Sequence, residues 1–318
     1  MNAPGAVTRR PRLLPSIVPI TAVLAIAAAL AVPGFTSGPN LSNVGQQAAM
    51  LLMLSMPMTL VIMSEGLDLS AGALLSLCGV VLAKVLVAGA GLPLALLASM
   101  GIGLVLGLLN GVLVSVLTLP PFVVTLGTLG IAQGAALVVT DGNAVTGIGP
   151  QAASFYALAP LGVPVSLLIA LATWGLTHVL LYHTRFGNSV FAIGGHRDAL
   201  VLAGVRVHLY HIAIYALMGL VVGVTALLLT GRMNSGHPTV AIGMEFDAIA
   251  AVVLGGTAFE RGDGRLYGTV FGVATIGIVR NALNLMGIES SMQVVSIGVL
   301  VIVVIFLDSS RKQKGRAA

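Results

Sequence analysis

The chain has 318 residues, of which 57% are apolar and only 8% are charged, and its mean hydropathy is +1.06. Soluble domains carry about 25% charged residues, so the composition excludes an ordinary soluble protein and predicts a polytopic membrane protein. The net charge of +5 is spread over short loops and the chain ends, which indicates orientation in a membrane rather than nucleic-acid binding. Long continuous apolar runs favour an all-α fold.

Ten apolar segments predict membrane-spanning helices, each needing about 20 residues. Together they form a single transmembrane domain at residues 13–308, between an N-terminal tail at residues 1–12 and a basic tail at residues 309–318. The expected spans are residues 13–33, 44–63, 71–90, 92–116, 121–140, 164–182, 208–230, 242–258, 266–286 and 290–308.

The basic residues predict that both tails are cytoplasmic. On this layout the inner loops and tails hold all basic residues except Lys84, Arg232 and Arg280, in agreement with the positive-inside rule. The first run follows three arginines and is similar to a secretory signal. Because the run has about 20 residues rather than the 7–15 of a signal core, we expect an uncleaved span.

The segment SEGLDLSAG at residues 64–72 places two acids between apolar runs. It is either an inner loop or a helix break within the membrane, whose free backbone groups line a pathway. Hydrogen bonding between helices is the alternative role for uncharged polar residues inside spans. The candidates for the translocation pathway are Glu65, Asp68, Ser70, Asn110, Thr125, Thr128, Gln133, Glu245 and Asp247.

Small and flexible side chains inside the spans predict packing roles. The glycines of GIGLVLGLLNG, residues 101–111, indicate close helix approach, since small residues let helices meet in a membrane. Cys78 lies in an apolar run, and we expect it to pack there. We expect the same of a methionine cluster in the second span, which consists of Met50, Met53, Met56, Met58 and Met63.

Two connections differ sharply in charge. The outer segment at residues 141–164 carries no basic residue and is suited to a lid or an external docking surface. The stretch at residues 182–208 carries arginines and histidines and is the longest break between apolar runs. Within it, residues 198–203 predict a short helical turn closed by Gly204, because glycine tolerates the positive φ that ends a helix. We interpret this stretch as a cytoplasmic docking loop for a soluble partner.

The eighth segment is the weakest of the ten. Its apolar part, residues 248–259, is short enough to be re-entrant. A re-entrant segment would place the basic C-terminal tail outside, so we expect a crossing whose outer end includes Glu245 and Asp247. A charge at the bilayer centre costs about 2.5–3.5 kcal/mol, so we expect both acids near the surface or facing a wet cavity.

Motifs for catalysis are missing from the sequence. There is no GxxxxGK[ST] phosphate loop, no GxSxG elbow and no HExxH pair. Four histidines near residues 183–211 suggest a metal site, but polar residues at the inner boundary of a span give the same pattern. We therefore expect no enzyme activity, no cofactor and no metal.

Four stretches resemble the permease subunits of bacterial ATP-binding-cassette sugar importers of the ribose, xylose, arabinose and autoinducer-2 group. The combination of PPFVVTLGT with DAIAAVVLGGT is the specific part of this resemblance, which covers roughly residues 40–310. The stretches are EGLDLSAGALLSLCGVVLA (65–83), LNGVLVSVLTLPPFVVTLGTLGIAQGAALVVT (109–140), TRFGNSVFAIGGHRDALVLAGVRV (184–207) and GMEFDAIAAVVLGGTAFERGDGRLYGTVFGV (243–273).

The resemblance implies an inner-membrane permease that works by alternating access. Its implied partners are a second permease subunit, identical or paralogous, two cytoplasmic ATPases, a periplasmic solute-binding protein and the surrounding lipid, with no nucleic acid. The loop at residues 182–208 matches the family's coupling segment, which contacts the ATPase. The implied coupling residues are Gly194, Gly195, Arg197, Asp198, Ala199 and Gly204.

Two residues depart from the family's pattern. Arg197 stands where the family usually has an acid, and Glu65 stands where it favours a glycine. A second transport class also fits the sequence: an ion-coupled secondary transporter that uses Glu65, Asp68, Glu245 or Asp247 as cation sites. A passive channel is a third class. The sequence leaves the identity of the solute open.

Overall fold

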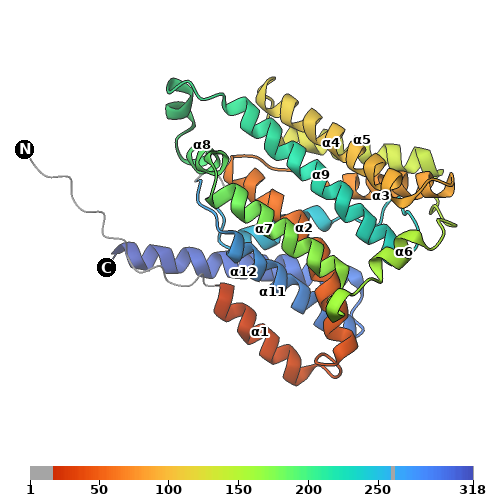
Figure 1. Cartoon of the computed structure of the whole chain (residues 1–318). Coiled ribbons are helices and arrows are strands. Elements are labelled where there is room, and N and C mark those ends of the chain that lie inside the picture. Colours follow the sequence, from red (N-terminus) through yellow and green to blue (C-terminus); the bar gives the residue numbers. More distant parts are fainter. Residues whose placement is uncertain (1–16, 259–261, 318) are drawn as a thin grey trace, which may run out of the picture.

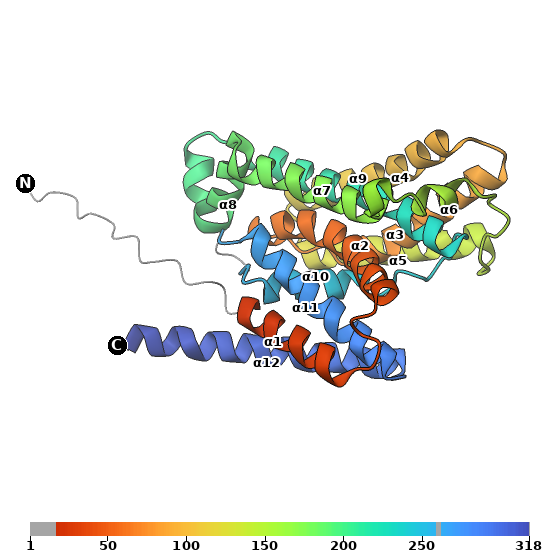
Figure 2. The ribbon, with the colours of Figure 1, turned by 60° about the horizontal axis from the view of Figure 1, so that its bottom comes forward.

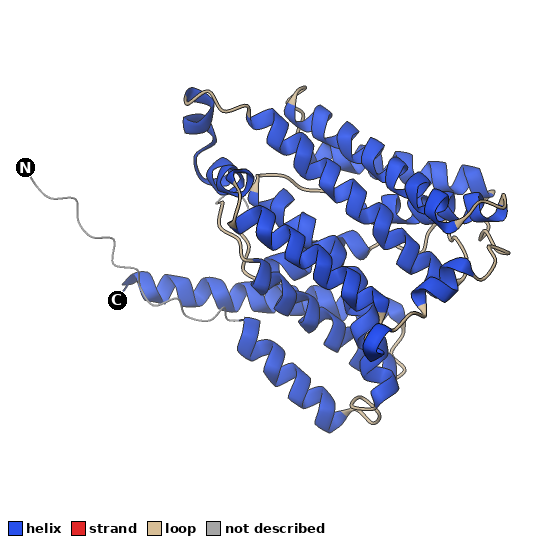
Figure 3. Ribbon diagram, viewed as in Figure 1, coloured by secondary structure: helices blue, strands red, loops and turns tan. Residues whose placement is uncertain are grey.

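The computed structural model describes residues 17–258 and 262–317, so the tail expected at residues 1–12 lies outside the described residues. Over the described residues the fold is all-α, apart from an isolated bridge between Val145 and Gly236 (Figure 3). The helices are α1 (Ile17–Ala31), α2 (Gly38–Met63), α3 (Ala71–Val87), α4 (Leu92–Ser115), α5 (Pro121–Thr140), α6 (Gln151–Tyr156), η1 (Pro160–Gly162), α7 (Val165–Tyr182), α8 (Arg185–Leu202), α9 (Val207–Met233), α10 (Met244–Leu254), α11 (Leu266–Leu285) and α12 (Ser290–Ala317).

Six of the described helices are long and apolar enough to cross a membrane, namely α2, α4, α5, α7, α9 and α11. Three shorter apolar helical stretches are α1, α3 and the first part of α12, Ser290–Val303. α10 has 11 residues, too few to cross a bilayer alone. The multi-pass membrane fold is therefore confirmed, and the count of ten spans stays a prediction. α12 continues as a helix through residues 309–317 of the expected tail.

α2 lies in the middle of the bundle, where it contacts α7, α9, α10 and α11. α3, α4, α5 and α9 pack together on one side, and α1 and α12 lie with α11 on the other (Figures 1 and 2). α8 lies at one end of the bundle and α6 at the opposite end, and α12 projects beyond the α8 end. Below, these are called the α8 end and the α6 end.

The second half of α2 forms the core of the bundle. Its methionine cluster is buried throughout (Met50, Met53, Met56, Met58 and Met63), and Cys78 of α3 is buried beside it. The predicted packing roles of these side chains are confirmed. Flexible thioethers suit a site where several helices converge at different angles.

α4 and α9 approach each other closely through glycines. A Cβ on Gly103 would meet the carbonyl oxygen of Gly219, and a Cβ on Gly107 would meet the carbonyl oxygen of Tyr215. One turn further along α4, Gly111 lies against the backbone of Ile212. The predicted close approach is therefore confirmed, and its partner is α9.

Two non-helical segments interrupt the bundle: residues 64–70 between α2 and α3, and residues 234–243 between α9 and α10. The second segment begins at the α6 end, where Gly236 pairs with Val145. It then follows α3 into the bundle, where the Ala241 N–H donates to Ser76 Oγ at 3.1 Å. α10 therefore begins inside the bundle.

Because α10 begins inside the bundle, its two acids do not lie where the sequence predicted. Glu245 and Asp247 lie in the first turn of α10, inside the bundle, and not at an outer end. Their exposed fractions are 2% and 8%, so the expectation of a surface or wet-cavity position is wrong in this chain. The physical reason is that residues 234–243 cover the stretch toward the α6 end without forming a helix.

Candidate functional site

The break at residues 64–70 is held inside the bundle by its own acid and by α4. Asp68 Oδ1 accepts hydrogen bonds from the backbone N–H of Ser70 at 2.8 Å and from Ser70 Oγ at 2.6 Å. Asn110 of α4 donates from Nδ2 to Ser70 Oγ at 3.0 Å. Asp68, Ser70 and Asn110 are all buried. The carboxylate satisfies the Ser70 N–H at the start of α3, where the helix dipole favours negative charge.

Carbonyl groups of the same break are satisfied by α5 and α9. The Leu67 carbonyl accepts from Thr125 Oγ1 at 3.2 Å and from the Tyr215 hydroxyl at 3.1 Å. The Ser64 carbonyl accepts from His211 Nε2 at 2.8 Å. Together with the Asn110 contact from α4, these bonds join the segment to three helices, α4, α5 and α9. The segment is therefore a buried break and not a surface loop.

His211 and Tyr215 were not recognised as supports of the break from the sequence. They lie four residues apart on α9, so they share one helix face. The spacing of four residues was the sequence signal that could have indicated a shared role for the two side chains. It did not indicate that the partners are backbone carbonyls more than 140 residues away.

Glu245 plays the corresponding role at the start of α10. Both of its carboxylate oxygens accept from the Gly243 N–H, at 3.1 and 3.0 Å. The carboxylate also lies against Gly72 of α3, because a Cβ on Gly72 would meet Glu245 Oε2. The first turns of α3 and α10 therefore meet inside the bundle, each with a carboxylate bound to its own backbone.

Asp247 forms an ion pair with Arg280 of α11. Arg280 Nη2 lies 2.7 Å from Asp247 Oδ2 and 3.0 Å from Oδ1. A carboxylate inside a membrane protein is stabilised by a partner of opposite charge. This pair explains both the burial of Asp247 and the position of Arg280 outside the inner loops.

Two further pathway candidates, Thr128 and Gln133, bond within the chain. Thr128 Oγ1 donates to carbonyls of its own helix, at Val124 and Thr125. Gln133 donates from Nε2 to the Pro238 carbonyl at 3.1 Å, which ties α5 to the segment at residues 234–243. Contact of the pathway candidates with a solute stays a prediction.

α8 consists of two helical pieces joined at His196, whose φ of −153° and ψ of 56° are not helical. The first piece is packed against the bundle. A Cβ on Gly194 would meet the carbonyl oxygen of Met63, the last residue of α2, and the backbone of Gly262. The first piece of α8 is therefore fixed directly to the end of α2.

The second piece of α8 faces outward. Arg197, Asp198 and Ala199 are exposed, and Leu202 is 89% exposed. Gly195, at the end of the first piece, is exposed as well. The helix ends at Leu202, and Gly204 follows with a φ of +78°. The predicted helical turn closed by Gly204 is confirmed, although the helix begins earlier, at Arg185.

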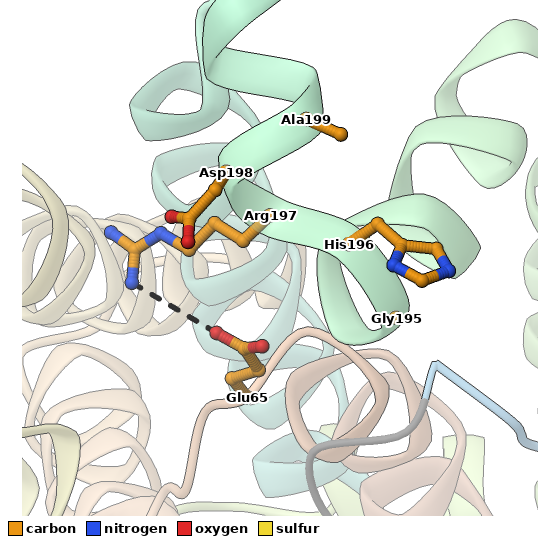
Figure 4. A pocket seen from close by; sticks show the side chains of 6 residues that line it. All are labelled: Glu65, Gly195, His196, Arg197, Asp198 and Ala199. Atoms are coloured by element: carbon orange, nitrogen blue, oxygen red, sulfur yellow. Dashed lines mark ion pairs between the residues drawn. The ribbon is translucent and has the colours of Figure 1, made fainter.

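A pocket of about 590 Å³ lies between the second piece of α8 and the break, with Glu65 on its floor (Figure 4). Arg197 points from α8 toward Glu65, and the two side chains form an ion pair at 3.9 Å. His196 points to the other side of the helix. Both partners are partly exposed, with side-chain exposures of 45% for Arg197 and 29% for Glu65.

The sequence matches known transport proteins over most of its length. The family described as branched-chain amino acid transport system / permease component matches residues 40–305. The ribose import permease protein RbsC of Bacillus subtilis (strain 168) is 38% identical over 291 residues, covering 91% of this chain and 90% of the relative. RbsC of Escherichia coli (strain K12) is 34% identical over 305 residues, covering 93% and 94%.

A relative named for a different sugar is equally well covered. The D-allose transport system permease protein AlsC of Escherichia coli (strain K12) is 33% identical over 291 residues, covering 90% of this chain and 88% of the relative. No solved structure matches the chain.

Proposed function

Because the chain belongs to the family of permease components of branched-chain amino acid transport systems, we propose that it carries a monosaccharide across the inner membrane as part of an ATP-binding-cassette importer. The observation that carries this proposal is the match to ribose and allose permeases over about nine tenths of the chain. As a permease subunit, the chain is not an enzyme. In such systems the ATPase is a separate chain.

The family implies ATPase and solute-binding partners in general. For this chain we propose two cytoplasmic ATPases, a periplasmic binding protein and a second copy of the permease. We place the α8 end on the cytoplasmic side, with ten spans formed by α1–α5, α7 and α9–α12. The support is the positive-inside rule, since Arg185, Arg197 and Arg206 belong to the 182–208 connection.

The mechanism follows from the contacts of α8. ATP-driven closure of the ATPases would displace the exposed second piece of α8. The first piece transmits this displacement to the end of α2, because Gly194 leaves no space between the two backbones. Residues 64–70 continue from that end into the bundle, where they contact α4, α5 and α9. Closure at one end is thereby converted into rearrangement of the spans.

Uptake by a reconstituted complex tests this function. The permease, its ATPase and its binding protein would be placed in proteoliposomes with ATP inside, and uptake of ribose, allose and arabinose would be measured. We expect uptake of at least one sugar that requires both ATP and the binding protein. A matched control omits the ATPase and imposes a proton or sodium gradient. Uptake under the control condition would contradict the proposal and support an ion-coupled transporter.

A further inference from the structure

The two pieces of α8 differ in how they are attached to the bundle. Gly194 fixes the first piece against Met63 and Gly262 by direct backbone contact. The second piece begins after the non-helical residue His196, and all of its residues except the half-buried Leu200 are exposed. A pocket of about 590 Å³ separates it from the break. The second piece therefore has room to tilt about His196 unless a side chain holds it.

Arg197 is the first residue of the second piece, and its side chain reaches across the pocket. Its guanidinium lies 3.9 Å from the carboxylate of Glu65 (Figure 4). Glu65 is the second residue of the break at residues 64–70. The ion pair therefore joins the movable piece of α8 to the segment that enters the bundle.

The backbone of Glu65 has a conformation that favours glycine over other residues. Its φ is +64°, in the left-handed region that glycine adopts freely and other residues adopt at a cost. Glycine would therefore be the better residue for the backbone alone. The carboxylate instead supplies the negative partner of Arg197.

We propose that Glu65 and Arg197 are a positioning pair that makes the second piece of α8 and the break at residues 64–70 move together. This inference rests on the proposed function and deepens it, since it adds to the Gly194 contact a second link between ATPase closure and the transmembrane break. Neither residue contacts the solute in this role. The pair acts through the segments that it connects.

The expected effect is moderate, because both side chains are partly exposed. Exposed ion pairs contribute up to about 1 kcal/mol, which corresponds to about a fivefold change. We therefore expect loss of the pair to lower the sugar transported per ATP hydrolysed by about fivefold. Glu65 lies in the break and not on the exposed piece of α8, so the Glu65 variants are expected to keep their association with the ATPase.

The test is a charge exchange in the reconstituted complex. The single variants Arg197→Glu and Glu65→Lys each place like charges opposite one another. The double variant Glu65→Lys/Arg197→Glu restores an opposite-charge pair. Lysine at position 65 has a Cβ, so its backbone strain is the same as that of the wild-type glutamate. The readouts are sugar transported per ATP hydrolysed and copurification of the ATPase. The matched control is Glu65→Lys/Arg206→Glu. It has the same net charge as the charge exchange, but its new glutamate replaces Arg206, another exposed arginine of the 182–208 connection.

A further variant separates positioning from folding. Glu65→Gly removes both the carboxylate and the unfavourable φ, so we expect an unfolding temperature equal to or above that of the wild type. Transport per ATP should nevertheless fall about fivefold. A merely structural role for Glu65 would leave transport per ATP unchanged in this variant.

The outcomes are distinct. Reduced coupling in both single variants, with recovery in the charge exchange and none in the Arg206 control, supports the pair. Loss of ATPase copurification in Arg197→Glu without recovery in the exchange would overturn the pair and assign Arg197 to the ATPase interface. Unchanged coupling in every variant would also overturn it. Wild-type uptake that follows an ion gradient and ignores ATP would instead remove the proposed function, and with it the role of the pair.

Discussion

At the scale of single residues, buried polar side chains at the two breaks satisfy backbone groups that the breaks leave without helical partners. Asp68 accepts from the Ser70 N–H just before α3, and Glu245 accepts from the Gly243 N–H just before α10. Thr125, His211 and Tyr215 donate to carbonyls of the first break. A membrane interior offers no water to these groups, so the chain must supply their partners itself. Acids in such positions do not require a transported cation to explain them.

The ion pair between Asp247 and Arg280 gives a prediction at this scale. Arg280→Met leaves the buried carboxylate of Asp247 without its partner, so we expect the free energy of unfolding to fall by about 3 kcal/mol. This is the lower limit for breaking a buried pair, because about a third of the Arg280 side chain is exposed. The double variant Asp247→Asn/Arg280→Met removes the charge as well and should recover most of that loss. Unfolding in detergent, followed by Trp174 fluorescence, measures both. Equal stability of the two variants would contradict this explanation.

The glycines of α4 give a second prediction. Gly103→Ala places a methyl group against the Gly219 carbonyl, and overpacking of this kind costs about 1–3 kcal/mol. Gly101→Ala is the matched control on the same helix, because a Cβ there meets nothing within 4 Å. Alanine is a better helix former than glycine, so the control should be neutral or slightly stabilising. Thermal unfolding of both variants in detergent checks the difference, and a stable Gly103→Ala would contradict the close packing with α9.

At the scale of elements, α8 combines a fixed piece with an exposed piece. The fixed piece needs glycine at residue 194 because two backbones meet there. The exposed piece presents Asp198, Val201 and Leu202 to its surroundings, and a largely exposed apolar side chain next to charges is suited to a protein partner. The element therefore has the form expected of a segment that docks on one side and transmits movement on the other.

Two changes in the exposed piece should weaken ATPase association. Asp198→Lys reverses a charge on the proposed docking face. Gly204→Val forces a β-branched residue into a φ of +78° at the end of α8. We expect severalfold less ATPase to copurify with each variant, with normal membrane insertion. Matched controls at the α6 end are Glu289→Lys and Gly89→Val, since Gly89 has a φ of +85° and, like Gly204, open space around it. Unchanged copurification with Asp198→Lys and Gly204→Val would count against the coupling assignment.

At the scale of the whole molecule, the structure has two ends of different chemistry. The α8 end carries the arginines of the 182–208 connection, whereas the α6 end carries the segment at residues 141–164, which has no basic residue. By the positive-inside rule, this asymmetry supports the proposed orientation with the α8 end in the cytoplasm. The orientation determines from which side the ATPase and the solute-binding protein can reach the chain.

Cysteine labelling tests the orientation. Cys78 is buried, so the native chain should react little with a membrane-impermeant maleimide. Ala199→Cys on α8 and Thr146→Cys near the α6 end both introduce a thiol at an exposed position. In intact cells we expect labelling of Thr146→Cys alone, and in inside-out vesicles labelling of Ala199→Cys alone. The reverse pattern would overturn the proposed topology.

The sequence by itself determined the class of protein and nearly all helix positions. Apolar run length decides where a helix can span a bilayer, and the expected segments at residues 71–90, 92–116 and 121–140 agree with α3, α4 and α5 to within a few residues. The close approach at Gly103 and Gly107 and the helix end at Gly204 were also readable, because glycine is the residue that each of these local geometries needs.

Only the tertiary structure decided which groups meet. The residues of the break at 64–70 find partners on α4, α5 and α9, Asp247 finds Arg280, and Arg197 finds Glu65. The burial of Glu245 and Asp247 was mispredicted because residues 234–243 enter the bundle without forming a helix. The physical reason is common to all of these contacts. Local sequence sets backbone preference and hydrophobicity, whereas a hydrogen bond or an ion pair between distant segments depends on how the helices pack in three dimensions.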